Sequence, residues 1–283
     1  MTRPQIEAVT TALLPDFAQF LHQHLDPGRS PAQWAEGLSR GWLANAPNHG
    51  FVLRVDGAIV GGIGACYAER RIRGRSERFC NVTSWCVLDS HRQQSMRLAM
   101  TLVGQPGFHY TDFSPTKVVS GTLQFLKFKP LDERQVVALN LPWPALDGLR
   151  VVTRPAEIEN LLEADALATY RDHAGFPWLH HLLLGGGRDW CHVIYRRKSF
   201  KGLPSAHVLY ASDNALLQLG WHRLSRHLLL RGMVSTHAEY RLIKREPWPS
   251  RVRSGFNAKV FLSPTLTPDE IDCLYSEQVA LDL

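Results

Sequence analysis

A short Asp56-Gly57 pair separates two strand-like runs, and it constrains the fold more than any other local feature of the chain. Phe51 to Val55 precedes the pair, and Ala58 to Tyr67 follows it. Asp-Gly between two such runs is typical of a two-residue hairpin turn. A third run, Phe79 to Leu88, is rich in Val, Thr and Trp and predicts another strand. We therefore expect three consecutive strands of an antiparallel sheet.

Helical patterns flank these strands. Apolar residues between Ile6 and Leu25 recur at spacings of three and four, which predicts a helix that Pro15 kinks or breaks. Ser30-Pro31 predicts the N-cap and first turn of a second helix ending near Leu43. The later elements are predicted in this order: a helix from His91 to Val103 capped by Asp89-Ser90, a strand from His109 to Phe113, a helix from Ser114-Pro115 to Leu126, and a strand pair from Phe128 to Leu141.

The plan repeats after a Pro-rich segment. Pro142-Trp143-Pro144 and Asp147-Gly148 indicate a linker between domains of residues 1–143 and 149–283. The predicted elements of the second half are a strand at 149–152, helices at 154–173 and 177–184, strands at 191–197 and 206–211, a helix at 215–231 and a strand at 235–243. Similar length and order predict a duplication. The predicted fold class is α/β, with a mixed, mostly antiparallel central sheet flanked by helices in each half.

The composition of the chain indicates the cellular compartment in which the protein is expected. The chain has 283 residues and five cysteines, an odd number with no Cys-x-x-Cys pair, so neither a disulfide framework nor a zinc site is indicated. A reducing compartment is the simplest interpretation. No apolar run reaches the roughly 18 residues of a membrane span, and the first residues are polar rather than typical of a signal peptide. We expect a cytoplasmic protein.

The net charge of +6 favours an anionic partner, although solubility alone explains a charge of this size in a chain this long. The residues from Arg70 to Arg78 include five arginines and are predicted to form a solvated hairpin loop, with an anionic ligand as the alternative. The aromatic and basic stretch from Trp190 to Lys198 suggests RNA binding as a hypothesis, but an ordinary amphipathic strand pair is the better interpretation of it. Nucleic acid is therefore not the expected partner.

Two segments carry a resemblance to a known family. Val87 to Leu98 resembles the acyl-CoA motif of the GNAT (GCN5-related) N-acetyltransferases, in which a strand leads into Arg/Gln-x-x-Gly-x-Gly/Ala and then a helix. Leu123 to Leu131 resembles a later family signature. The resemblance implies the acyl-CoA N-acyltransferase fold for residues 1–143 and, in more divergent form, for 149–283. It also implies acetyl-CoA or another acyl-CoA as co-substrate.

The resemblance implies a set of cofactor-binding residues around the start of the helix. A helix N-terminus offers free backbone N–H groups and a positive dipole end to the pyrophosphate of coenzyme A. Ser95 and Arg97 stand at the two glycine positions of the motif, and Arg97 offers a cation in place of close backbone approach. The predicted cofactor-binding residues are Cys86, Val87, Arg92, Gln93, Gln94, Ser95, Met96 and Arg97.

Catalysis of acyl transfer requires a base for the amine and a proton donor for the thiolate. Asp89, His109 and Tyr110 are the predicted catalytic residues, because they lie at the strand ends where the family places its reacting groups. Leu123 stands at the position where the family often has a tyrosine that acts as general acid. Cys86 is interpreted as a buried, inert thiol rather than a nucleophile. The thirteen histidines show no His-Glu-x-x-His pattern, so no metal site is predicted.

Three functions follow from these observations. The first is acyl-CoA-dependent transfer of an acyl group to an amine, with a small molecule or a peptide as acceptor. The second is a non-catalytic protein of the same fold, which the missing motif glycines favour. The third is a Fem-type transferase that takes its acyl group from aminoacyl-tRNA, which a duplicated fold and a basic surface would suit.

Overall fold

The computed structural model describes residues 4–144 and 148–282. It divides into two compact units, which are described separately. The first unit comprises Met1–Leu131 together with Asn257–Leu283, and the second comprises Asp132–Phe256. No helix in the described ranges is long and apolar enough to cross a membrane.

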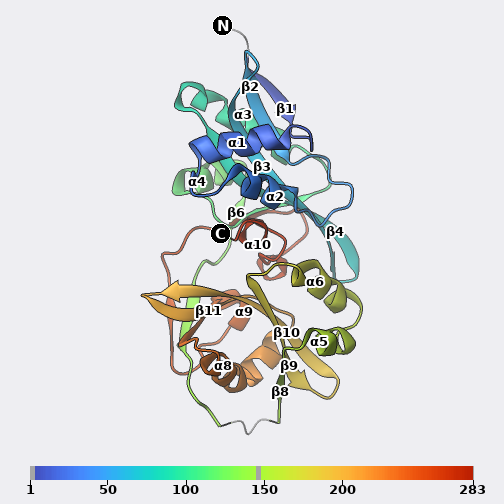
Figure 1. Ribbon diagram of the computed structural model, residues 1–283, viewed down its shortest axis with the longest axis vertical. Helices are drawn as coiled ribbons and strands as arrows, with labels where there is room; N and C mark the ends of the chain where they lie inside the picture. The colour runs from blue at the N-terminus through green and yellow to red at the C-terminus, as the bar shows by residue number, and fades with distance from the viewer. Residues whose placement is uncertain (1–3, 145–147, 283) are drawn as a thin grey trace. The chain divides into compact units, whose positions relative to one another are not determined.

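The first unit is built on a seven-stranded sheet (Figure 1). Its β4 and β5 pair in parallel, and all its other neighbours are antiparallel. In spatial order the strands are β1 (Gln5–Ala8), β2 (Gly50–Val55), β3 (Ala58–Ile72), β4 (Arg75–Val87), β5 (His109–Asp112), β14 (Val260–Leu262) and β6 (Lys129–Pro130).

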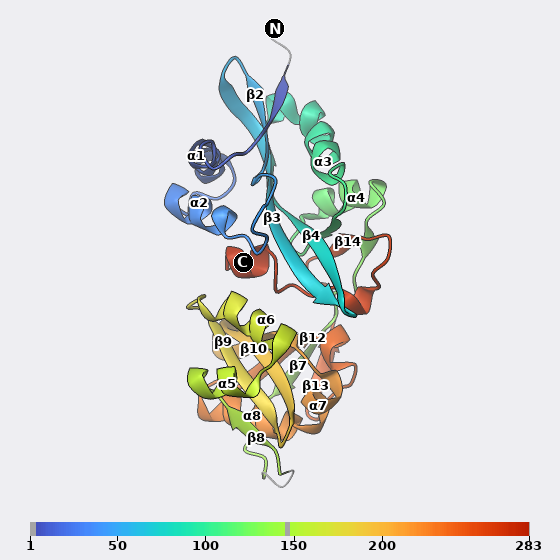
Figure 2. The ribbon, with the colours of Figure 1, turned by 90° about the vertical axis from the view of Figure 1, so that its right-hand side faces the viewer.

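Helices cover both faces of this sheet. Figure 2 shows α1 (Leu14–His24) and α2 (Pro31–Ser39) on one side of it, and α3 (Ser95–Val103) and α4 (Lys117–Phe125) on the other. Successive residues of a strand point to opposite faces. Accordingly Val52 packs in the cluster of α1 and α2, whereas its neighbour Leu53 packs in the cluster of α3 and α4.

The second unit has its own seven-stranded sheet and is covered in the same way. Leu183 packs with the helices α5 (Pro155–Leu161) and α6 (Ala164–Ala174), whereas Leu182 and Leu184 pack with the cluster of α7 (Asn214–Leu219), α8 (Trp221–Leu230) and α9 (Tyr240–Ile243). In spatial order the strands are β13 (Ser250–Arg253), β7 (Gln135–Leu139), β12 (Ser235–Glu239), β11 (Leu203–Ala211), β10 (Asp189–Phe200), β9 (Leu179–Gly186) and β8 (Arg150–Val152).

Both sheets follow one topological pattern. From β1 or from β8, three antiparallel pairs are followed by one parallel pair and then by two antiparallel pairs. In each sheet the sixth strand comes from the other half of the chain: β14 lies between β5 and β6, and β7 lies between β12 and β13. The predicted mixed, mostly antiparallel α/β class is confirmed, and the predicted duplication fits the two sheets.

This exchange of strands moves the unit boundaries away from the predicted ranges of 1–143 and 149–283. Residues 135–139, predicted to complete the first sheet, pair instead with β12 and β13 of the second. Val260–Leu262 returns to the first sheet and pairs with β5 and β6. The proposed linker signal at Asp147 lies outside the described residues.

Several local predictions hold and others fail. Asp56 and Gly57 form the hairpin turn with φ of 49° and 83°, and Ser30 caps α2 in a capping box with Gln33. The helix predicted from Ile6 is wrong at its start, because Gln5–Ala8 pairs with β2 and the helix begins only at Leu14. The helix predicted over 177–184 is also wrong, since Leu179–Gly186 is strand β9.

Candidate functional site

The first unit opens where its two parallel strands part. β4 and β5 pair from Phe79↔His109 to Asn81↔Thr111. β4 continues to Val87, whereas β5 ends at Asp112. Within the described residues, Val82–Val87 therefore has no strand partner on the β5 side. An unpaired strand edge offers backbone N–H and C=O groups to an extended ligand.

A β-bulge lies in this open stretch. The register of β3 and β4 shifts between Gly62↔Cys86 and Gly64↔Thr83, so Ser84 and Trp85 stand against Ile63 alone. Ser84 takes a φ of 51°, a backbone conformation that a residue with a side chain adopts at some cost. Bulges of this kind free one residue from the ladder and are common beside functional sites. The glycines at positions 61, 62 and 64 of the partner strand are a sequence signal of such a bulge.

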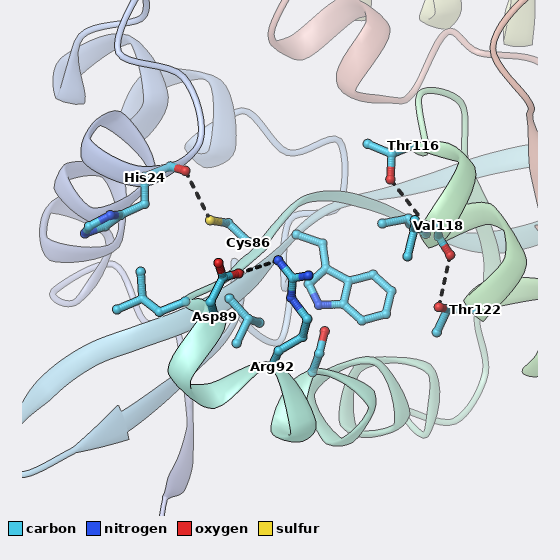
Figure 3. Close-up of a pocket in the computed structure, with 12 residues that line it drawn as sticks. His24, Cys86, Asp89, Arg92, Thr116, Val118 and Thr122 are labelled. Carbon is cyan, nitrogen blue, oxygen red and sulfur yellow. Dashed lines mark hydrogen bonds and ion pairs between the residues drawn. The ribbon is translucent and has the colours of Figure 1, made fainter.

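A cavity of about 570 Å³ lies at the open edge. In Figure 3 the labelled side chains from β4 and the following turn lie across from those of α4. The wall of the cavity combines apolar residues with hydroxyl groups and one arginine. The lining residues are His24, Trp85, Cys86, Val87, Leu88, Asp89, Arg92, Ser95, Thr116, Val118, Val119 and Thr122.

The turn after β4 is helical but has no side-chain cap. A 3₁₀ helix, η1 (Asp89–Gln94), runs directly into α3, and at its start the His91 N–H donates to Leu88 O at 2.9 Å. The predicted N-cap at Asp89-Ser90 is wrong. The Asp89 carboxylate accepts from Arg92 instead, and the Ser90 hydroxyl lies 2.9 Å from His91 Nδ1. The start of this helical segment is therefore open to an anion.

The structure divides the predicted cofactor residues into two groups. Cys86, Val87, Arg92 and Ser95 line the cavity. Gln93, Gln94, Met96 and Arg97 are not among its lining residues, and the Arg97 guanidinium donates to Gln94 Oε1 at 2.6 Å. Cofactor binding by either group stays a prediction.

The three predicted catalytic residues are not brought together. Asp89 lies at the cavity. His109 is buried, and its Nε2 lies 2.9 Å from Glu77 Oε2. Tyr110 is also buried, its hydroxyl donates to the backbone oxygen of Gln105, and burial raises its pKa. Neither His109 nor Tyr110 lines the cavity, so their catalytic role stays a prediction.

Cys86 differs from the other cysteines. Four of the five cysteines are buried, whereas Cys86 is only half-buried and faces the cavity. Its Sγ donates to the backbone oxygen of His24 at 3.5 Å, and burial raises the pKa of its thiol. No base among the described residues contacts this thiol, so it serves as a wall of the cavity.

The arginine-rich run forms strand and turn rather than a free loop. β3 and β4 pair as far as Ile72↔Arg75, and the turn is Arg73-Gly74. Arg70 pairs with Asp272, and Arg73 Nε lies 2.7 Å from Glu270 Oε1. Arg78 lies 4.2 Å from the ring centroid of Phe108. The contacts of Arg70 and Arg73 hold the C-terminal segment of the first unit, which explains these two arginines without a ligand.

In the described part of the second unit, the stretch beyond the parallel pairing is shorter than in the first unit. β11 continues past its last pairing, Val208↔Ala238, only as far as Ala211. The helix that follows, α7, is capped by Asp213, whose Oδ1 accepts from Leu216 N at 2.8 Å. This cap occupies a backbone N–H group at the helix start that would otherwise be free for an anion. The candidate donor site therefore belongs to the first unit.

Sequence reasoning missed the far wall of the cavity. Thr116 caps α4 through Val119 N, and Thr122 stands one helical turn after Val118, to whose backbone oxygen it donates. The predicted helix began at Ser114-Pro115, which hid Thr116 as the cap. In residues 4–144 and 148–282, no group of three or more His, Cys, Asp or Glu side chains is arranged to hold a metal ion.

Comparisons with known proteins agree with this geometry at the level of fold. No family model and no curated protein matches the sequence. A GCN5-related N-acetyltransferase from Anabaena variabilis superposes with a TM-score of 0.62 and 10% identity, covering 92% of this chain and 72% of that one. One from Kribbella flavida gives 0.59 and 10%, covering 92% and 70%. A probable N-acyltransferase from Enterococcus faecalis gives 0.61 and 11%, covering 92% and 72%.

The chain thus has the GNAT fold, as the resemblance of its two segments predicted. That the second unit is a second, divergent GNAT-like domain stays a prediction, which the repeated strand pattern supports.

Proposed function

We propose that this protein is an acyl-CoA-dependent N-acyltransferase whose donor site is the cavity of the first unit. One observation carries the proposal: the unpaired edge of β4 from Val82 to Val87 opens into a cavity that ends at an uncapped helix start. An extended amide chain with an anionic head, such as pantetheine pyrophosphate, has the chemistry to fill both parts.

The donor would be held by backbone and side chain together. The amides of the pantetheine arm pair with the open edge of β4 in the manner of an added strand. The pyrophosphate lies at the start of η1, and Arg92 turns from Asp89 to the phosphate. This exchange costs little, because the Arg92–Asp89 pair is exposed on both sides and such pairs contribute little to stability.

The chemistry would take place beside the bulge. A thioester carbonyl that lies against Ser84 and Trp85 meets a backbone N–H freed from the ladder, and such a donor stabilises the negative charge that develops on the carbonyl oxygen. The cavity wall fixes the donor, so much of the rate gain comes from positioning. Asp89 also lines the cavity, and its proposed role is to relay a proton to the departing thiolate.

A non-catalytic protein of the same fold is the second candidate. The observation that favours it is the 3₁₀ helix itself, which uses the His91 and Ser95 N–H groups for bonds to Leu88 O and Arg92 O. Fewer backbone donors then remain for a pyrophosphate than a glycine-rich loop would supply.

Calorimetric titration with acetyl-CoA and CoA tests the proposal. We expect the unaltered protein to bind both ligands, and Arg92→Glu to weaken binding at least about tenfold, or about 1.4 kcal/mol, by placing a carboxylate beside the pyrophosphate. Arg75→Glu is the matched control. It makes the same charge change in the same unit at the end of the β3–β4 hairpin, away from the cavity lining.

The outcomes separate the candidates. Binding that Arg92→Glu weakens and Arg75→Glu does not supports the donor site. Equal losses in both variants would indicate a nonspecific charge effect and contradict it. Binding of acetyl-CoA without release of CoA in the presence of amines would identify a binding protein. No binding by the unaltered protein would exclude acyl-CoA as donor and leave either the aminoacyl-tRNA alternative or a non-catalytic protein of the same fold.

A further inference from the structure

A second cavity, of about 260 Å³, adjoins the first. The two share Trp85, Thr116 and Val119 in their linings, so the bulge of β4 borders both. The remaining wall of the second cavity comes from the segment after α1, from α2, from β4, and from the end of β5 with the loop that follows it. These lining residues are Leu25, Asp26, Trp34, Thr83, Ser84, Asp112, Ser114 and Pro115.

Two buried carboxyl groups interact at the wall of this cavity. Asp112, the last residue of β5, lines it and is only 4% exposed. Glu277, the first residue of α10 (Glu277–Ala280), is fully buried and interacts electrostatically with Asp112. The Oε1 of Glu277 accepts from Phe113 N at 3.1 Å and from the Ser114 hydroxyl at 2.8 Å. Asp112 Oδ1 accepts from Ser114 N at 3.1 Å.

This arrangement is a poor way to stabilise a fold. Two buried carboxyls without a basic partner between them repel when both are ionised. Glu277 Oε2 is buried and has no hydrogen-bond partner in the described residues. Burial raises the pKa of both groups, and the neighbouring Glu277 carboxyl raises that of Asp112 further, so the pair retains a proton into a range where a free carboxyl would be ionised. Such pairs are characteristic of sites that bind cations or move protons.

We propose that the second cavity binds the acceptor as a small primary ammonium ion, and that the Asp112 carboxylate removes its proton. The inference rests on the function proposed above, because the acyl donor lies across Trp85 in the adjoining cavity. Asp26 supplies a second anionic wall, and the small volume favours a compact amine over a folded peptide. Glu277 is a positioning residue that acts through Asp112.

The step balances without any further reactant. Asp112 takes one proton from the ammonium ion, and the nitrogen lone pair then attacks the thioester carbonyl carbon. A C–N bond forms and the C–S bond breaks, with its electron pair leaving on the CoA sulfur. The remaining excess proton of the new amide nitrogen passes to the thiolate. Asp112 returns its proton to solvent after the products leave.

Binding of the acceptor can be tested independently of the donor. Benzylamine is the probe, and benzyl alcohol is its uncharged counterpart of nearly equal shape. We expect benzylamine to bind at least about tenfold more tightly than the alcohol, a difference of about 1.4 kcal/mol. Asp112→Asn should abolish the difference. Glu7→Gln, on the exposed strand β1, is the control and should retain it. Equal binding of both probes, or a difference that survives Asp112→Asn, would overturn the proposal.

Turnover with acetyl-CoA and benzylamine gives a second, distinguishable readout. Asp112→Asn should retain acetyl-CoA affinity and lose at least about 100-fold in kcat, a loss within the usual contribution of a general base. Full activity of Asp112→Asn with intact acetyl-CoA binding would overturn this inference alone. Absence of acetyl-CoA binding by the unaltered protein would instead overturn the proposed function.

The pH profile separates a positioning role of Glu277 from a merely structural one. Glu277 from α10 is the charged group that acts on Asp112, and Asp26 lines the same cavity. Two cations lie over neighbouring rings, Arg29 over the lining residue Trp34 and Lys259 over Phe113, the residue after Asp112. Glu277→Gln removes the carboxyl that raises the pKa of Asp112 and preserves a side-chain acceptor for Phe113 N. The acidic limb of the rate profile should move to lower pH. An unmoved limb with normal folding would contradict the role of Glu277.

Discussion

Gly62 of β3 lies directly beneath the ring of Phe17 in α1. A Cβ atom at Gly62 would stand 2.3 Å from Cε2 of Phe17, far inside van der Waals contact. Phe17 is fully buried in the cluster that joins α1 and α2 to the sheet. The glycine therefore allows α1 to approach β3, and α1 in turn leads to His24 and Asp26 at the two cavities.

Gly62→Val should destabilise the first unit. The added methyl groups collide with an aromatic ring that other side chains hold in place, and overpacking of this kind costs about 1–3 kcal/mol. Thermal and denaturant unfolding measure the loss. Gly121→Ala is the control, because nothing lies within 4 Å of the added methyl and the site is within α4. It should gain up to about 1 kcal/mol. Equal stability of Gly62→Val and the parent would contradict the close packing.

Cys86 should be the thiol that modifying reagents reach first. The other four cysteines are buried, and Cys86 is half-buried at the larger cavity. With the folded protein, mass spectrometry after iodoacetamide treatment should find one modified cysteine, at Cys86. Because burial raises the pKa of this thiol, the rate should climb from neutral toward alkaline pH as the thiolate forms.

The same thiol reports on occupancy of the cavity. Acetyl-CoA should slow modification of Cys86 in the parent protein. Cys86→Ser should remain unmodified over the same period, which controls for reaction at Cys66, Cys80, Cys191 and Cys273. If benzylamine slowed modification of Cys86 and acetyl-CoA did not, the proposed placement of acetyl-CoA in the larger cavity and of the amine in the smaller one would be contradicted.

The histidines of the second unit should make it sensitive to mild acid. His192 is fully buried, its Nε2 lies 3.2 Å from His181 Nδ1, and its Nδ1 has no hydrogen-bond partner in the described chain. Burial lowers the pKa of His192 from 6.5 to about 3 and that of His181 to about 4. Both rings are neutral in the folded protein at pH 5, whereas in the unfolded chain both are protonated.

Stability should therefore fall as pH decreases through 6.5, because the unfolded state binds more protons than the folded state. At pH 5 the loss from His192 alone is about 2 kcal/mol, from 1.36 kcal/mol per pH unit below 6.5. Urea unfolding at pH 7.5, 6 and 5 measures it. His192→Gln removes one titrating ring and should flatten this dependence. The same slope in parent and variant would show that other groups cause the acid sensitivity.

Much of the first sheet could be predicted because its signals are local. The hairpin turn requires positive φ, which Asp56 and Gly57 can adopt. The Ser30 side chain accepts a hydrogen bond from a free N–H in the first turn of α2, and Pro31 fits that turn. β1 was missed because the spacing of Ile6 and Val9 fits a helix, and pairing with β2 overrides that local preference. β9 was missed for the same reason, since a short apolar run suits a buried strand or a helix equally.

The candidate site was predicted only where the motif is contiguous. Cys86, Val87, Arg92 and Ser95 follow one another along the chain and line one cavity. Asp112 and Glu277 lie on β5 and α10, and their proximity depends on the return of the C-terminal segment to the first unit. No local pattern encodes that return, because β14 has only three residues and pairs with strands distant in sequence.

The exchanged strands make a matched pair of core substitutions informative. Val260 of β14 and Val136 of β7 are each fully buried at the sixth position of a sheet, Val260 in the first unit and Val136 in the second. Truncation of either to alanine removes two buried methyl groups and should cost about 2 kcal/mol. Hydrogen exchange measured by mass spectrometry locates the loss.

Val260→Ala should accelerate exchange in β5, with which it pairs at Val260↔Asp112, and leave β12 protected. Val136→Ala should accelerate exchange in β12, through Val136↔Ala238, and leave β5 protected. Accelerated exchange in β5 on Val136→Ala, with β12 unchanged, would mean that each half of the chain completes its own sheet. Since β5 ends at Asp112, Val260→Ala should also weaken the preference for benzylamine over benzyl alcohol, whereas Val136→Ala should not.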